Sequence, residues 1–174
     1  VADNGYRAEI DLYAGHFTGG DLVEAALTHN LQKELSNIID LCNGKTRALV
    51  EIYSGRFRYQ NAKVVLRAIF NEVDVKKVEH SILPEESEIN VPWLKIIEES
   101  NTIRDAVEQM RRLPFGKELL AVGEEEGLQK YEDALDRHYF KHSLKMLQGG
   151  APEIRLLRNL MASEIDHRNI INIL

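Results

Sequence analysis

The sequence predicts an all-α fold built from repeated helical units. Several stretches place apolar residues at intervals of three and four, which is the period of one face of a helix. Glycine or proline stands where such stretches end or begin, as at residues 43–44, 149–150 and 152. No stretch of useful length alternates apolar and polar residues as a half-buried strand does.

The first long helix is expected from Asp21 to the stop at residues 43–44. Its apolar stripe consists of Leu22, Ala25, Ala26, Leu31, Leu35, Ile38, Ile39 and Cys42. Two shorter helices are predicted next, over residues 46–53 and 58–73, and the second would bury Ala62, Val65, Leu66 and Ile69. Residues 83–88 should form a loop, because a proline at position 84 excludes helical geometry in the residue before it.

The second half of the chain also predicts a series of helices. Pro92 opens a short helix that contains Trp93, and Asn101 or Thr102 caps the next one. The helix after Thr102 is expected to bury Ile103, Val107 and Met110. A longer helix over residues 128–147 follows, with the inward residues Leu128, Tyr131, Leu135, Tyr139, Leu144 and Leu147. Pro152 then starts a helix that would bury Ile154, Leu157 and Leu160, and a separate last helix is expected from Asp166.

The composition excludes several classes of protein. Hydrophobic residues make up 44% and charged residues 29% of 174 residues, which is typical of a globular chain with a core. A net charge of −6 argues against a nucleic-acid partner, since phosphate binding needs a basic surface. The longest uncharged apolar run, residues 170–174, is too short to cross a bilayer. A single cysteine, Cys42, allows no internal disulfide and is expected as a small buried hydrophobe in a reducing cytosol.

An internal repeat appears when the chain is shifted against itself by about 108 residues. Residues 24–27 then lie over 132–135. Other matched pairs are Arg47 with Arg155, Leu49 with Leu157, Asn61 with Asn169 and Leu66 with Leu174. We therefore predict a first unit over residues 1–72, connecting helices over 73–112 and a second unit over 113–174. Such units usually present surface to partners, which tilts the expectation away from catalysis.

The paired asparagines lie on the apolar faces of their predicted helices. Asn61 is four residues from Phe57 and Val65, and Asn169 has the same relation to Ile165 and Ile173. A buried amide costs free energy unless it is hydrogen-bonded. We therefore expect both side chains to be buried and to tie their helices to a neighbouring segment.

Two motifs suggest chemistry but are incomplete. Residues 44–46, Gly-Lys-Thr, resemble the end of a phosphate-binding loop, yet Ile39 stands where that signature needs a glycine, so no bound nucleotide is expected. Glu164 with His167, and His138 with His142, have the spacing of metal ligands on facing helices, although a di-iron bundle needs two such Glu-x-x-His elements. A helical-bundle enzyme with a carboxylate and histidine metal site is one alternative function, and an unrelated helical adaptor is another. No cofactor is predicted.

Several motifs in order resemble the C subunit of archaeal-type (A-type) rotary ATP synthases and the related d subunit of vacuolar-type ATPases. Residues 47–53 and 61–67 resemble the short helix and the D-x-x-N-x-x-x-x-L-R element of that family, with Arg58 where the family has aspartate. Residues 164–174 resemble its E-I-D-x-x-N-I element, and residues 113–116 and 132–139 resemble the preceding segments. The matched structural positions are Arg47, Asn61, Arg67, Glu164, Asp166 and Asn169.

The resemblance implies a non-catalytic subunit. Family members are about twice this long and build three units with pseudo-threefold symmetry around a funnel. The chain would carry two of the three units and be a piece of a longer protein, since it stops at Leu174 inside the motif. Such a subunit is a socket on the cytoplasmic face of the membrane, between the proteolipid rotor ring and the central-shaft subunits, and touches the membrane only through the ring. The coupling ion would be a proton or sodium.

Overall fold

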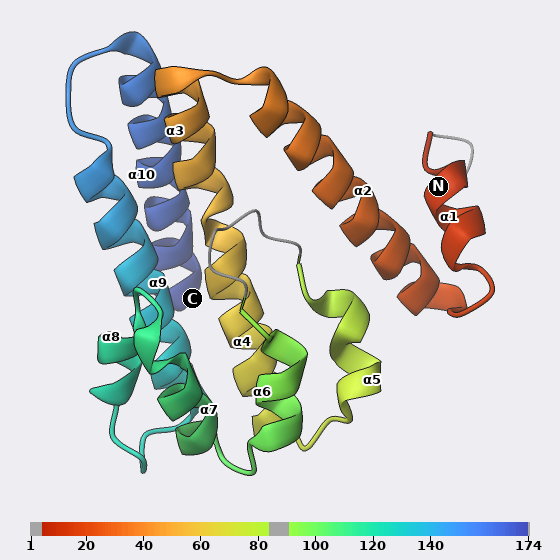
Figure 1. The fold of residues 1–174 in the computed structure, drawn as a ribbon. Helices are drawn as coiled ribbons and strands as arrows, with labels where there is room; N and C mark the ends of the chain where they lie inside the picture. The colour runs from red at the N-terminus through yellow and green to blue at the C-terminus, as the bar shows by residue number, and fades with distance from the viewer. Residues whose placement is uncertain (1–4, 84–90, 174) are drawn as a thin grey trace.

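The computed structural model describes residues 5–83 and 91–173, and every regular element in those ranges is a helix (Figure 1). The all-α prediction is therefore confirmed. The elements are α1 (Arg7–Tyr13), α2 (Gly19–Leu41), α3 (Gly44–Ser54), α4 (Arg56–Phe70), α5 (Val75–Val78), η2 (Glu79–Ser81), α6 (Trp93–Glu99), α7 (Ile103–Gln109), η3 (Met110–Arg112), α8 (Gly116–Leu120), α9 (Leu128–Met146) and α10 (Pro152–Ile173). The loop predicted at Pro84 to Glu88 and the motif end at Leu174 lie outside the described residues.

Helices α3 and α4 form one nearly continuous rod. Only Gly55 separates them, and it keeps right-handed helical backbone angles, with its amide donating to the Glu51 carbonyl oxygen. Helix α7 is capped by Thr102, one of the two residues expected for this role. The Thr102 hydroxyl accepts from the Asp105 amide, and the Asp105 carboxylate accepts from the Thr102 amide, which forms a capping box.

Helix α4 lies at the centre of the fold. It packs against α6, α7 and α9, so that side chains on most of its circumference are buried. The expected inward residues Ala62, Val65 and Leu66 have no exposed surface. Tyr139 belongs to this core, as expected, and so do Trp93 and Phe140.

Helix α2 stands apart from the bundle of α3–α4, α9 and α10 (Figure 1). It packs mainly against α1, η2 and the start of α3. Its predicted stripe is therefore buried only in part. Ala25, Ala26 and Ile39 are buried, whereas Leu31 and Ile38 are exposed. Cys42, which was expected to be buried, is half-buried. The apolar stripe is longer than the surface that α1 and η2 cover.

The C-terminal segment differs from the prediction. Residues 152–173 form the single helix α10, rather than two helices with a second start at Asp166. Ser163 stands at the repeat position of Gly55, and it continues the helix without a break. Leu160 was expected to be buried but is 46% exposed, whereas the neighbouring Met161 is fully buried. The face of α10 that packs on the core contains Ile154, Leu157, Met161 and Ile165.

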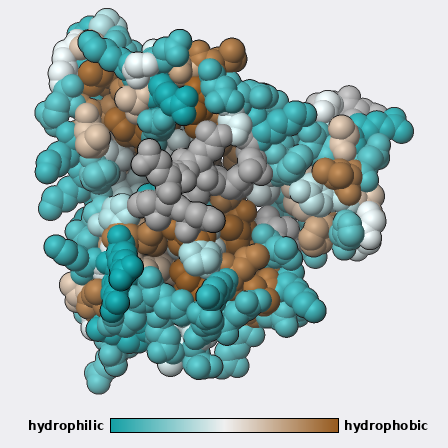
Figure 2. Space-filling model, viewed as in Figure 1, coloured by the Kyte–Doolittle hydropathy of each residue, from teal (hydrophilic) through white to brown (hydrophobic). Residues whose placement is uncertain are grey.

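The predicted boundaries at residues 72 and 112 stay a prediction, as does the funnel-shaped arrangement of units. The face seen in Figure 2 is mostly hydrophilic, with hydrophobic areas at the upper end of the bundle, in the middle of the view and on the arm formed by α1 and α2. Within the described ranges, no helix combines the length and the apolar character needed to cross a membrane.

Candidate functional site

A polar seam joins α4, α9 and α10, three long elements of the bundle. Its strongest contact is bidentate: Arg67 Nε and Nη2 donate to the two carboxylate oxygens of Glu132 at 2.6 and 2.7 Å. Paired, charge-assisted bonds of this kind fix orientation as well as distance. The hydrogen bonds that Arg67 donates to Glu132 raise the pKa of the Arg67 guanidinium above its ordinary value. Glu132 itself is buried.

One carboxylate of α9 connects both neighbouring helices. Asp136 Oδ2 forms an ion pair with Lys63 Nζ of α4 at 2.7 Å and another with Arg168 of α10. The Lys63 side chain is only 6% exposed, so this pairing compensates the cost of removing its charge from water. Arg168 additionally lies over the Phe140 ring, with its guanidinium carbon 5.3 Å from the ring centroid. Asp136 therefore holds α4, α9 and α10 in one register.

A third contact links the two copies of the predicted repeat. Arg56 Nη1 donates to Glu164 Oε1 at 3.1 Å, across a sequence separation of 108 residues. The two residues thus occupy the same position in the first and second copies. Arg56 also donates to the Tyr53 hydroxyl at 2.8 Å. The predicted motif residue Glu164 consequently acts as an ion-pair partner between α10 and α4.

Asn61 is fully buried and ties α4 to the segment after η2. Its Nδ2 donates to the Leu83 carbonyl oxygen at 2.6 Å, and its Oδ1 accepts from the Leu83 amide at 2.7 Å. These two bonds satisfy both backbone groups of one residue. The expectation that Asn61 is a buried group tied to a neighbouring segment is confirmed.

The other predicted motif residues lie at the surface. Asn169 is exposed, so its predicted burial was wrong, and Asp166 is exposed as well. The reason is packing: α10 contacts the bundle through the face that carries Met161 and Ile165, and little covers its other faces near Asn169. Arg47 forms an exposed pair with Glu51 one turn away, 2.9 Å from Nε to Oε1. The six motif positions therefore do not converge on one site.

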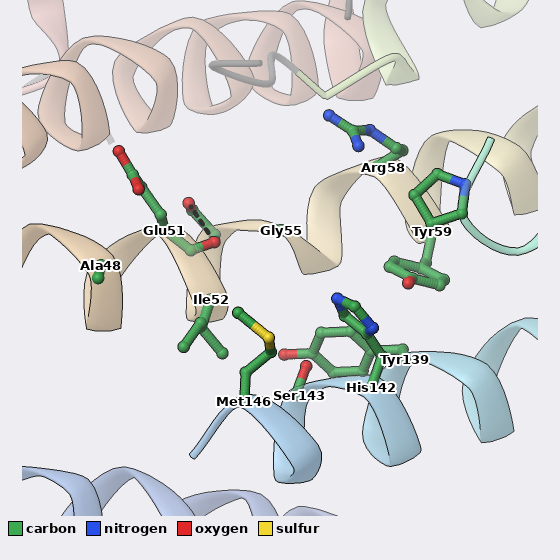
Figure 3. Close-up of a pocket in the computed structure, with 12 residues that line it drawn as sticks. Ala48, Glu51, Ile52, Gly55, Arg58, Tyr59, Tyr139, His142, Ser143 and Met146 are labelled. Atoms are coloured by element: carbon green, nitrogen blue, oxygen red, sulfur yellow. Dashed lines mark hydrogen bonds between the residues drawn. The ribbon is translucent and has the colours of Figure 1, made fainter. Parts of the chain in front are cut away.

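An open hollow of about 320 Å³ lies between the α3–α4 rod and α9 (Figure 3). Its lining includes Ile52, Arg58, Tyr59, Tyr139, His142 and Met146. Burial raises the pKa of both Tyr59 and Tyr139 to about 12, so both phenols are neutral at physiological pH. Beside the hollow, the Tyr59 hydroxyl lies 2.9 Å from His138 Nδ1. Burial lowers the pKa of His138, and the nearby Glu118 carboxylate opposes that shift.

The two motifs with possible chemistry are used structurally. Glu164 pairs with Arg56, and His138 is bonded to Tyr59 and stacked on His142 with ring centroids 5.7 Å apart. Across residues 5–83 and 91–173, no group of three or more His, Cys, Asp or Glu side chains is placed to hold a metal ion. Residues 44–46 open α3 directly after helix α2, not after a strand.

Sequence reasoning missed the central members of the seam, Lys63, Asp136 and Arg168. The helix period gave no signal for Lys63, because this residue lies to one side of the predicted stripe of Ala62, Val65, Leu66 and Ile69. Its partner Asp136 could not be predicted, since it lies 73 residues further along the chain on another helix.

Comparison with known proteins places the chain in a family. Residues 2–174 match the family model described as ATP synthase (C/AC39) subunit. The chain belongs to this family. Its relatives include the C subunit of the A-type ATP synthase of Haloferax volcanii, which is 29% identical over 100% of the chain and 51% of the relative. The protein of the same name in Archaeoglobus fulgidus is 25% identical over 100% of the chain and 50% of the relative.

The chain thus spans about half the length of the ATP synthase (C/AC39) subunit relatives it matches. No solved structure shows a significant match. Family membership confirms the resemblance seen in the motifs and excludes the alternative of an unrelated helical adaptor. The polar seam lies within the region that the family model covers.

Proposed function

We propose that the chain is part of a non-catalytic central-stalk subunit of a rotary ATP synthase that moves protons or sodium ions. In this role it couples the central-shaft subunits to the proteolipid rotor ring at the cytoplasmic face of the membrane. It is peripheral, contacts the membrane only through the ring and binds no nucleotide. The observation that carries the proposal is the family match over residues 2–174.

The polar seam supports a mechanical role. A subunit that transmits torque must resist sliding between its helices, and apolar packing alone is weakly directional. Four ion pairs cross the helices of the bundle: Arg67 with Glu132, Asp136 with Lys63, Asp136 with Arg168, and Arg56 with Glu164. Each ties an identified position of one helix to an identified position of another. Together with the tie from Asn61 to Leu83, they favour a unit that turns as one body.

The chemistry of the hollow also fits a structural role. General acid and base catalysis works best with groups whose pKa lies near the working pH. The two buried phenols have pKa values of about 12, far above that range. The acidic groups of the seam are occupied by arginine and lysine partners.

The first test measures ATP turnover by the purified chain. We expect none above the buffer control. Saturable hydrolysis that survives further purification and follows the protein peak would contradict the structural role.

The second test exchanges the matching half of the Haloferax volcanii relative for this chain and measures assembly of the ATP synthase. We expect the chimera to assemble and to restore part of the ATP synthesis. Asp136→Lys, which places three cations together at the seam, should reduce coupling, whereas the exposed Asp166→Asn should not. A folded chimera that fails to join the complex would count against the proposal.

A further inference from the structure

A histidine between α4, α8 and α9 has its two ring nitrogens directed at different helices. The side chain of His138 on α9 is only 13% exposed. Its Nδ1 lies 2.9 Å from the Tyr59 hydroxyl of α4, and its Nε2 lies 3.7 Å from Glu118 Oε1 of α8. The Phe115 ring stands nearly perpendicular to the imidazole, with ring centroids 6.4 Å apart. His138 is therefore held between a phenol of one helix and a carboxylate of another.

These two contacts determine which nitrogen carries the proton of the neutral ring. Burial raises the pKa of Tyr59 to about 12, so the phenol keeps its proton at physiological pH and can donate it to Nδ1. The ring proton then lies on Nε2 and faces the Glu118 carboxylate, which is electrostatically favourable. The opposite tautomer would direct a lone pair at that carboxylate. It would also leave the buried phenol proton unpaired, because within residues 5–83 and 91–173 the Tyr59 hydroxyl has no partner other than His138.

A proton added to His138 changes both contacts. It enters at Nδ1, the nitrogen that accepts from Tyr59, so the phenol can no longer donate there. The phenol proton must turn away into surroundings that, in the described ranges, offer it no other acceptor. This weakens the contact between α9 and α4. At the same time the imidazolium forms a charged pair with Glu118, which strengthens the contact between α9 and α8.

Glu118 is the nearby group that favours a charged ring. Burial lowers the pKa of His138, Glu118 raises it, and the neighbouring His142 and Lys141 lower it. Most of the remaining charges around the site are cationic and oppose a further positive charge. Besides Glu118, the titratable and charged groups that adjoin His138 or Tyr59, or line the hollow at His138, are Arg58 of α4, Glu126 of the segment before α9, and Lys130, Arg137, Lys141 and His142 of α9.

From this geometry we propose that His138 is a pH-sensitive switch between two helix contacts. The neutral ring holds α9 to α4 by accepting from Tyr59. The protonated ring releases Tyr59 as a donor and holds α9 to α8 through Glu118. The proposal does not rest on the proposed function, since it uses only contacts inside the bundle and requires no surface of the chain to be free.

The first experiment is nuclear magnetic resonance of the isotope-labelled chain, which identifies the protonated ring nitrogen. Above the pH at which His138 titrates, we expect the proton on Nε2 and none on Nδ1. The His138→Gln variant assigns the resonances, and the exposed His167 on α10 provides an internal reference. A neutral ring with its proton on Nδ1 would overturn the proposal without any need for a further variant.

Two variants then test the two contacts separately. Tyr59→Phe removes the donor that stabilises the neutral ring, so it should raise the pKa of His138, whereas Glu118→Gln should lower it. The phenylalanine keeps the aromatic ring that packs 4.9 Å from Phe115 and 5.3 Å from Tyr139, measured between centroids, which favours a folded variant. A pKa of His138 that Tyr59→Phe lowers or leaves unchanged would contradict the switch.

The deciding experiment measures unfolding free energy on both sides of the His138 titration. The stability loss caused by Tyr59→Phe should shrink on acidification, because the protonated ring no longer uses the phenol as a donor. The loss caused by Glu118→Gln should grow, because the charged pair forms only with the protonated ring. Losses that change in the same direction in both variants, or that do not depend on pH, would overturn the proposal.

Discussion

Helices α4 and α10 carry corresponding positions of the repeat but occupy different surroundings. Helix α4 packs against α6, α7 and α9, whereas α10 packs mainly against α9. Consequently Asn61 is fully buried and bonded to Leu83, whereas its counterpart Asn169 is exposed. The comparison teaches that a repeated motif specifies a helix and its apolar face, whereas neighbouring elements decide whether that face is buried.

The largest expected effect contrasts leucines of the two helices. Leu66 of α4 has no exposed surface, and truncation to alanine leaves a cavity in the core. We expect Leu66→Ala to lower the free energy of unfolding by about 2–5 kcal/mol. Leu160→Ala on α10 should cost less than about 1 kcal/mol, because Leu160 is largely exposed. Urea unfolding followed by circular dichroism measures both losses. Equal losses would contradict the assignment of Leu66 to the core and Leu160 to the surface.

The paired asparagines give the next largest difference. Asn61→Leu leaves the amide and carbonyl of Leu83 without partners, so we expect a loss of about 1–3 kcal/mol of unfolding free energy despite the added apolar area. Asn169→Leu breaks no buried bond and should stay within about 0.5 kcal/mol of wild type. A stability loss confined to Asn169→Leu would reverse our assignment of the two environments.

These contrasts show what the sequence could predict about the fold. Periodicity identified the helical class, the core of α4 and the stripe of α9, because burial there follows the apolar face of a single helix. It did not reveal that residues 152–173 form one helix, since Asp166 resembles a helix start although the preceding residues continue the turn without interruption. The partial exposure of α2 could not be predicted from the sequence either, because it depends on which elements pack against that helix.

The ion pairs of the seam should contribute less than the core. Arg67→Ala removes both bonds to the mostly buried Glu132 carboxylate, but the Arg67 side chain is half exposed and its interaction is screened by water. We expect a loss of about 1 kcal/mol, and removal of the exposed Arg47 to Glu51 pair on α3 should cost about 0.3–0.5 kcal/mol. A double-mutant cycle with Glu132→Gln measures the coupling. No coupling between Arg67 and Glu132 would mean that this contact does not hold α4 to α9.

The smallest effect concerns pH. Burial lowers the pKa of His138 in the folded chain, so the unfolded chain takes up the proton first as pH falls. Stability is then fully present above the unfolded pKa of about 6.5 and declines as pH falls through the lower folded value. His138→Gln should flatten this decline between about pH 7.5 and about pH 5.5.

Glu118→Gln tests the direction of the pKa shift at His138. The Glu118 carboxylate raises the pKa of His138, so its removal should steepen the decline in stability on acidification. Thermal melting at several pH values measures both variants. A wild-type pH dependence in His138→Gln would show that other groups cause it.

The candidate site was predicted only in part from the sequence. Asn61 was identified correctly because an amide on an apolar face must find a partner, and that rule needs only one helix. The partners of Arg67, Lys63 and Glu164 lie on helices far along the chain, at separations of 65 to 108 residues, so their pairing required the fold. Family resemblance supplied the positions but not these contacts.

Native-state hydrogen exchange tests the central contrast most directly, because it reports local opening along each helix of the intact chain. We expect the amides of residues 61–66 in α4 to exchange only through global unfolding, since neighbours surround that turn. The amides of residues 163–168 in α10 should exchange at a lower free energy of opening, since the described part of the chain leaves one face of α10 exposed at Leu156, Leu160 and Ile170. Equal protection of the two segments at the level of global unfolding would contradict the view that the second copy of the motif presents an open face.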